Sequence, residues 1–142
     1  MLFPKKVKHR KWQTGRKNPN KIKNASRGIR IVNGDFGLKA TSGARINSNQ
    51  IESARKVLTR EVGKFGKYYI RLFPDRPVTQ KAAEVGMGKG KGDPKGFCTE
   101  VHPGRIMFEV GNVSDARARE ALRKAGTKLP VTFKIVSKND IY

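Results

Sequence analysis

The sequence predicts an α+β fold, a two-layer sandwich in which two helices cover a mostly antiparallel sheet. Two observations support this prediction: alternating segments lie in pairs around turn residues, and two segments with helical periodicity lie between them. An extended basic N-terminal arm and a Gly/Lys loop fall outside both patterns. We therefore expect an RNA-binding arm over residues 1–28 and a single α+β domain over residues 29–142, with a functional loop at about residues 77–96.

The N-terminal quarter is the most basic part of a chain whose formal net charge is +21. Residues 1–34 contain no acidic side chain, and they hold 11 of the 32 lysines and arginines. Prolines and glycines prevent a long helix here, and apolar residues are too sparse to bury much surface. We expect this arm to be disordered alone and to order against folded RNA, with its cations on phosphates and with Trp12 and His9 stacking on bases or sugars.

Two alternating segments follow the arm. Residues 29–32 and 36–40 alternate as half-buried strands do, on either side of Asn33-Gly34-Asp35, which is a strong turn signal. The pattern predicts either a hairpin or one interrupted edge strand.

A helix is predicted from Asn49 to Val62. Asn49 and Glu52 have the spacing of a capping box, and apolar residues recur at helical spacing up to Gly63. The opposite face carries Arg55, Lys56 and Arg60. These cations form either a solvated stripe or a phosphate-contacting one.

The middle of the chain combines a strand and an unusual loop. Residues 65–73 are rich in aromatic and β-branched residues and predict a strand, which the prolines of residues 74–77 end. A linking segment containing Lys81 then leads to Gly86–Gly92, in which every second residue is glycine. Each glycine would weaken a helix or strand by about 0.5–1 kcal/mol, so this run is a loop.

The loop has two interpretations. It is either a flexible connection between strands, or a surface whose bare N–H groups and two lysines bind phosphates. A nucleotide-binding P-loop is excluded because Lys91 is followed by Gly92 instead of Ser or Thr. The dinucleotide fingerprint G-x-G-x-x-G also fails, because Asp93 stands three residues beyond Gly90.

The C-terminal half predicts a hairpin, a helix and a last strand. Residues 97–101 and 105–110 flank His102-Pro103-Gly104, where Pro then Gly suits a type II turn between antiparallel strands. Ser114 caps a helix that ends at Gly126, with small apolar residues on one face. Residues 131–136 alternate as a strand.

Composition excludes several classes of function. No apolar run approaches the ~18 residues of a membrane span, so nucleic acid is a better polyanionic partner than lipid. The single cysteine, Cys98, allows no internal disulfide, and its place on a strand suggests a buried or half-buried thiol. No Cys/His spacing fits zinc, and the 11 carboxylates are dispersed, so we expect no metal, no cofactor and no enzymatic activity.

Localisation is predicted from what the N-terminus lacks. No apolar core follows the first lysines, which excludes a secretory signal. An organelle transit peptide is the alternative interpretation, because the region is basic and poor in acids, although serine is scarce and helix breakers interrupt it.

Several segments, in the same order along the chain, resemble the bacterial-type large-subunit ribosomal protein L-sixteen family. They are residues 1–12, 49–55, 73–79, 87–92, 103–105, 118–122 and 128–133. The resemblance runs almost from end to end. One departure is Gly86, where many members of that family have arginine, so a cation contact there is not transferred to this chain.

The resemblance implies a structural, non-enzymatic constituent of the large ribosomal subunit. It implies binding to large-subunit (23S-type) rRNA near the A site and the peptidyl transferase centre, support of aminoacyl-tRNA binding, and contacts with A-site tRNA and neighbouring ribosomal proteins. It places the chain on a cytoplasmic bacterial ribosome or an organellar one. Composition alone also allows a free basic nucleic-acid-binding protein or RNA chaperone.

The residues expected to contact RNA are the arm's cations and aromatic residues, selected arginines and lysines of the domain, and the loop. They are Lys5, Lys6, Lys8, His9, Arg10, Lys11, Trp12, Arg16, Lys17, Arg27, Arg55, Arg76, Lys81, Met87, Gly88, Lys89, Gly90, Lys91 and Gly92.

Overall fold

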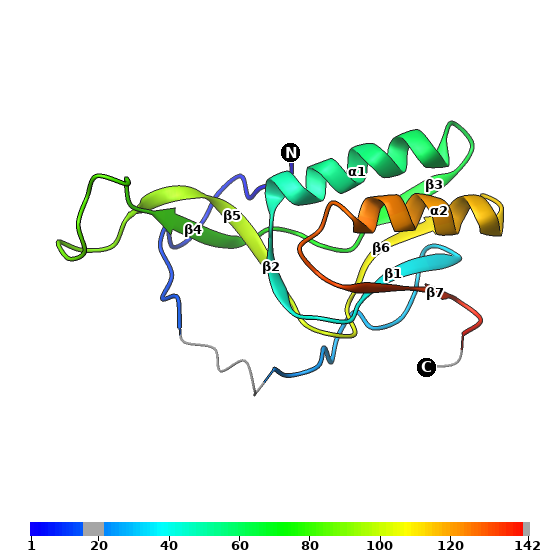
Figure 1. The fold of residues 1–142 in the computed structure, drawn as a ribbon, viewed down its shortest axis with the longest axis horizontal. Coiled ribbons are helices and arrows are strands. Elements are labelled where there is room, and N and C mark those ends of the chain that lie inside the picture. Colours follow the sequence, from blue (N-terminus) through cyan, green and yellow to red (C-terminus); the bar gives the residue numbers. More distant parts are fainter. Residues whose placement is uncertain (16–21, 141–142) are drawn as a thin grey trace.

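The computed structural model describes residues 1–15 and 22–140, and it confirms the α+β class (Figure 1). Two helices lie together over a sheet, and a long hairpin projects from the opposite end of the molecule. The elements in chain order are β1 (Phe36–Ala40), β2 (Ala44–Asn47), α1 (Ser48–Val62), β3 (Lys67–Ile70), β4 (Arg76–Gln80), β5 (Asp93–Val101), β6 (Ile106–Gly111), α2 (Asp115–Gly126) and β7 (Phe133–Ser137).

The strands form two antiparallel sheets where the sequence suggested one. The larger has the order β3-β6-β1-β7, and the smaller has the order β2-β5-β4. β6 is buried along its whole length, as expected of an inner strand with a partner on each side. β3 and β7 are shifted or shortened versions of the strands predicted over residues 65–73 and 131–136.

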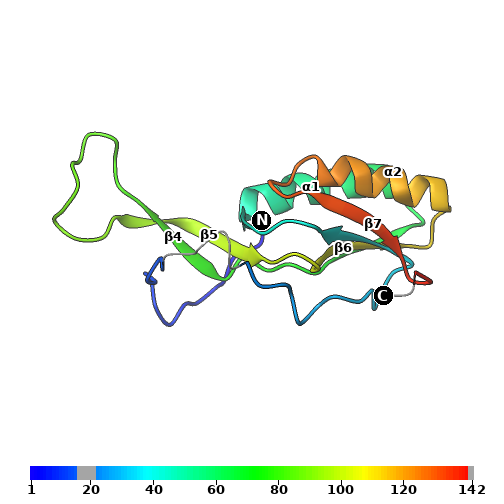
Figure 2. The same cartoon turned by 60° about the horizontal axis from the view of Figure 1, so that its bottom comes forward.

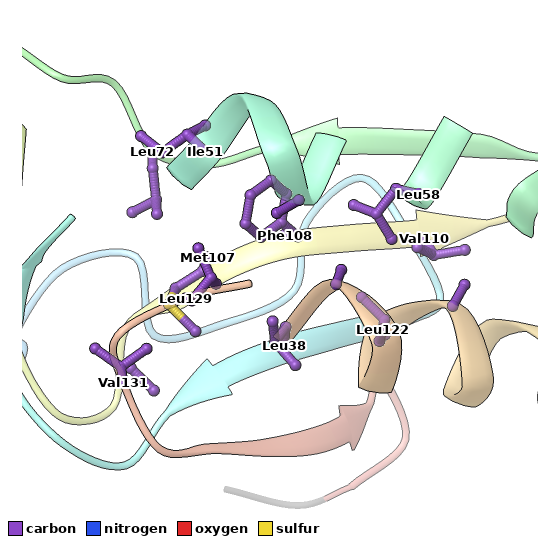
Figure 3. Close-up of a cluster of buried hydrophobic side chains, with 14 of the residues drawn as sticks. Leu38, Ile51, Leu58, Leu72, Met107, Phe108, Val110, Leu122, Leu129 and Val131 are labelled. Atoms are coloured by element: carbon purple, nitrogen blue, oxygen red, sulfur yellow. The ribbon is translucent and has the colours of Figure 1, made fainter. Parts of the chain in front are cut away.

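The main core fills the space between the larger sheet and the two helices (Figure 3). Leu38 and Phe108 from the sheet meet Ile51 and Leu58 from α1 and Leu122 from α2, and all are buried. Burying each such side chain contributes about 1.5–3 kcal/mol, so the helices and this sheet form the stable body of the protein.

The first helix forms nearly where the sequence predicts it, but its cap is different. The capping box uses Asn47 and Gln50, with the Gln50 Oε1 accepting a hydrogen bond from the Asn47 backbone N–H at 2.9 Å. β2 runs directly into α1, so the cap falls on the last strand residue. Glu52, predicted as the cap partner, instead pairs with Arg55 at 2.6 Å.

The second helix is confirmed, with Ser114 as its N-cap residue and Gly126 as its last residue. Its predicted apolar face is buried and consists of Ala118, Ala121, Leu122 and Ala125. Because three of these side chains are small, the helix lies close to the sheet.

The predicted hairpin around Pro103-Gly104 is wrong, although its turn forms. The Arg105 N–H donates to the His102 carbonyl at 3.2 Å, and Gly104 has a φ of 96°. The flanking strands belong to different sheets, because β1 and β3 occupy both edges of β6 and leave none for β5. The turn bonds instead to the end of β1, where the Ala40 N–H donates to the Arg105 carbonyl at 2.9 Å.

The strand predicted over residues 29–32 does not form, so both the hairpin and the interrupted-edge prediction are wrong. β1 already pairs with β6 and β7. The preceding segment instead runs beneath the larger sheet, on the side away from the helices (Figure 2). There Ile31 packs with Ile106 and Val136 in a second, smaller apolar cluster.

Backbone hydrogen bonds attach this lower segment to the sheet. The Ile106 N–H donates to the Gly28 carbonyl, and the Ala25 N–H donates to the Pro103 carbonyl, each at 2.8 Å. Gly28 has a φ of 66°, and a Cβ there would lie 2.8 Å from the Arg105 Nε. Both the conformation and the neighbouring Arg105 side chain therefore favour glycine at this position.

One buried carboxylate fixes the end of the same segment. Glu109 of β6 is fully buried and accepts hydrogen bonds from the backbone N–H groups of Val32 (3.1 Å), Asn33 (2.7 Å) and Gly34 (2.9 Å). It also forms an ion pair with Arg71. Burial alone raises the pKa of Glu109, but the three N–H donors and the guanidinium together hold it below its ordinary value.

We expect Glu109→Gln to lower the free energy of unfolding by about 3–5 kcal/mol, because it leaves Arg71 without its buried partner and points an amide NH2 at backbone N–H groups. Urea unfolding of the purified chain, followed by circular dichroism, measures the loss. Glu52→Gln is the matched control, since its pair with Arg55 lies at the surface and contributes little. Equal losses of unfolding free energy in the two variants would contradict the stabilising role assigned to buried Glu109.

The same carboxylate predicts a pH dependence. Because its folded-state pKa is lowered, its stabilisation is present above the unfolded-state pKa of about 4.3 and disappears as pH falls through the lower folded value. Unfolding free energies measured from pH 6 down to pH 2 should therefore fall more steeply for the wild type than for Glu109→Gln. Parallel curves would show that Glu109 does not ionise differently in the two states.

Candidate nucleic-acid interface

β4 and β5 form a two-stranded hairpin that projects from the body (Figures 1 and 2). β5 pairs with β2 only over Cys98–Val101, so its outer half pairs with β4 alone. The sequence predicted the end of a strand at residues 74–77 and then a linking segment, where the structure has β4. A proline is tolerated there since β4 is an edge strand.

Cys98 lies at the base of this hairpin and is buried, as predicted. Burial raises the pKa of its thiol. The side chain therefore packs as a small apolar residue, and the raised pKa disfavours the thiolate form that a nucleophile needs.

The hairpin ends in the glycine and lysine loop. Residues 81–92 form neither helix nor strand, which places the remainder of the predicted loop region in β4 and β5. Gly88, Lys89 and Gly90 are consecutive left-handed residues, with φ of 100°, 58° and 90°. Such a run favours glycine, which stands at two of its three positions, so the backbone is accessible at the tip beside the Lys89 side chain. Met87 is 99% exposed at this tip, and the Lys81 ammonium donates to the Gly88 carbonyl across the loop.

The N-terminal arm lies against the hairpin through a reciprocal pair of lysine contacts. The Lys11 Nζ donates to the Lys91 carbonyl at 3.3 Å, and the Lys91 Nζ donates to the Trp12 carbonyl. Lys91 also reaches the Thr14 hydroxyl at 3.5 Å. The arm and the loop, about eighty residues apart in the sequence, are thereby joined.

Two arginines of the smaller sheet hold the arm. Arg76 donates to the Gln13 carbonyl at 3.0 Å and the Thr14 carbonyl at 3.1 Å, and its guanidinium carbon lies 5.6 Å from the centre of the Trp12 ring. Arg45 donates to the same Thr14 carbonyl at 3.2 Å. Both arginines also pair with Glu100, at 3.3 Å and 3.1 Å.

Arg45 was missed by the sequence reasoning because β2 was not predicted. The alternation of Ala44 and Ile46 with Arg45 and Asn47 was the available signal. β2 has only four residues and runs directly into a helix, so this alternation is too short to predict a strand reliably.

The structure places the other predicted contact residues as follows. Exposed arm residues are Lys5, Lys6, Lys8, His9, Arg10, Lys11 and Trp12, and Arg27 is exposed on the segment beneath the sheet. Arg16 and Lys17 lie outside the described residues. Arg55 lies on α1, away from the projecting hairpin, and bonds to Glu52 and to the Tyr68 hydroxyl.

Within residues 1–15 and 22–140, no three His, Cys, Asp or Glu side chains gather as a metal ion would require. Neither α1 nor α2 has the length and hydropathy to span a bilayer.

The fold and the interface together define a basic α+β protein that carries cations on two joined projections, an arrangement suited to a polyanionic partner. The family described as ribosomal protein L16p/L10e matches residues 4–136 of the 142. The chain belongs to this family, a class of structural, non-enzymatic components of the large ribosomal subunit.

We expect Arg76→Ala to release the arm from the hairpin. The loss of two hydrogen bonds and a cation–π contact, about 2 kcal/mol in total, would shift the ratio of docked to free arm roughly 30-fold. Because Trp12 is the only tryptophan, acrylamide quenching and fluorescence anisotropy report its freedom directly. Arg60→Ala, an exposed change on α1, serves as the control. Quenching of Arg76→Ala at the wild-type level would contradict the docking.

Proposed function

We propose that this protein binds large-subunit rRNA near the A site and close to the peptidyl transferase centre, where it supports the binding of aminoacyl-tRNA. Membership of the ribosomal protein L16p/L10e family supports a structural ribosomal role. The more specific location rests on the resemblance of the arm and loop sequences to that family.

The observation that carries the proposal is the tip of the hairpin. An exposed, glycine-rich backbone with the side chains of Met87 and Lys89 beside it lies at the far end of a long projection. A bare backbone lets phosphates approach N–H groups closely, and ammonium groups neutralise them. Such a tip can reach between RNA helices that the body is too wide to enter.

The arm supplies the larger share of charge. Its cations from Lys5 to Arg10 are exposed, and the contacts that dock the arm are formed mainly by Lys11, Trp12 and Thr14. The exposed cations are therefore available to phosphates while the arm keeps its place on the hairpin. Neutralising the mutual repulsion of packed RNA helices would stabilise the tRNA site.

The proposed partners are large-subunit rRNA, A-site tRNA and neighbouring ribosomal proteins. The proposed location is the ribosome, in the bacterial cytoplasm or in an organelle. In each case the role is binding without turnover.

We expect the double variant Lys89→Ala/Lys91→Ala to weaken tRNA accommodation more than docking of the protein. Each lysine–phosphate pair that is lost should reduce the slope of log K for RNA binding against log salt concentration by about 0.7–0.9. Reconstituted large subunits carrying either chain would be compared for A-site tRNA binding over a range of salt concentrations. Equal activity of the two would count against the proposal.

A matched control removes the same number of lysines at a position far from the loop in the sequence. Lys134→Ala/Lys138→Ala removes two exposed lysines near the C-terminus, and we expect it to leave tRNA accommodation unchanged. Sedimentation tests the location itself: co-migration with large subunits after a moderate salt wash is expected. Release from the ribosomal fractions together with binding to duplex DNA would instead support a general nucleic-acid-binding protein.

A further inference from the structure

An open groove of about 1030 Å³ lies where the two sheets and the arm meet. Its lining comes from Trp12 of the arm, Tyr69 of β3, the connection that contains Phe73, Arg76 of β4 and Glu100 of β5. The volume is at the upper end of the roughly 300–1,000 Å³ typical of sites for small organic ligands.

The groove presents aromatic surface to solvent. Trp12 and Phe73 are 42% and 48% exposed, and both line this one groove. Tyr69 adds a third, half-buried ring. Flat rings exposed together favour a flat ligand that stacks on them.

Charge inside the groove is balanced, in contrast to the chain as a whole. Its arginines are Arg71, Arg76 and Arg105. The first two are paired with Glu109 and Glu100, and the exposed Asp75 also lines the groove. Paired arginines and an exposed carboxylate disfavour a phosphate here, although the surrounding arm is strongly basic.

We propose that this groove binds an unpaired nucleobase of RNA, stacked against Phe73 and Trp12. The inference rests on the proposed function, in which the chain binds large-subunit RNA, and adds a second type of contact to it. The base occupies the neutral aromatic groove, and the phosphates on either side lie on the exposed lysines of the arm.

The geometry of the arm supports this arrangement. Trp12 is held by the Arg76 guanidinium and by the bond from Lys91 to its carbonyl, so its ring is positioned before any ligand arrives. A stacking surface that is already ordered loses little entropy on binding. Lys11 and Arg10, which directly precede Trp12 in the sequence, are exposed and carry positive charge.

The test compares two probes that carry the same phosphates. A short oligouridylate and an abasic ribose-phosphate chain of equal length are titrated into the full-length protein, and Trp12 fluorescence is followed. We expect the oligouridylate to quench the fluorescence of Trp12 and to bind at least about 10-fold more tightly than the abasic chain. Equal affinity for the two chains would overturn the proposal.

Variants of the exposed rings localise the effect. Phe73→Ala should weaken oligouridylate binding by about 10-fold, whereas Phe73→Tyr should retain it. Phe65→Ala is the matched control, because Phe65 is 88% exposed but lies at the turn between α1 and β3, outside the groove. Phe73→Ala binding as tightly as the wild type, or Phe65→Ala showing the same loss, would overturn the proposal.

Ultraviolet cross-linking of assembled large subunits separates this inference from the proposed function. We expect a nucleotide adduct on the peptide containing Trp12 or Phe73. Subunits that contain the protein but give no such adduct would overturn the groove site and leave the ribosomal role intact. A protein that binds oligouridylate through Phe73 but fails to sediment with large subunits would retain the groove site and overturn the ribosomal role.

Discussion

The structure depends on one buried carboxylate, Glu109, which joins the sheet to the segment that leads out of the N-terminal arm. A carboxylate in this position would be costly without partners, and here three consecutive backbone N–H groups and Arg71 supply them. The segment of residues 32–34 is too polar and too short to be fixed by apolar packing. Glu109 therefore fixes the end of this segment next to β1, backbone hydrogen bonds at Ala25 and Gly28 attach its start, and Ile31 adds the apolar contact beneath the sheet.

Most cations that join the arm to the hairpin bond to neutral groups instead of to carboxylates. The contacts between arm and hairpin mainly join ammonium or guanidinium groups to backbone carbonyls, as in the bonds from Lys11 and Lys91. A carbonyl satisfies a hydrogen bond without cancelling the charge, so these cations remain attractive to an external anion. Glu100 is the exception at the base of the hairpin, where Arg45 and Arg76 share its carboxylate. The assembled arm and hairpin are consequently ordered and still strongly basic.

Local patterns in the sequence predicted the elements that depend on local interactions, and failed where tertiary pairing decides. Helical periodicity found both helices, and the Pro103-Gly104 turn formed, because helical repeats and tight turns depend on nearby residues. The turn did not make a hairpin, since the partners of β6 come from distant segments. Similarly, residues 29–32 alternate like a strand, but the N–H groups at the end of this segment donate to Glu109, which no local pattern reveals. The basic arm and the glycine loop were visible as composition, whereas the contact between them was not, because Lys11 and Lys91 meet only in the folded chain.

The contact between arm and loop has a mechanical consequence. A hairpin of two strands, with a tip rich in glycine, would by itself be a weakly oriented lever. The arm crosses beside it and bonds both to its base, through Arg76, and to its loop, through Lys91. Attachment at both places along one projection limits its bending, so the docked arm also helps to orient the tip. The N-terminal arm therefore does more than supply charge. Its docked residues restrict the movement of the loop, and its undocked lysines remain available to bind an anion.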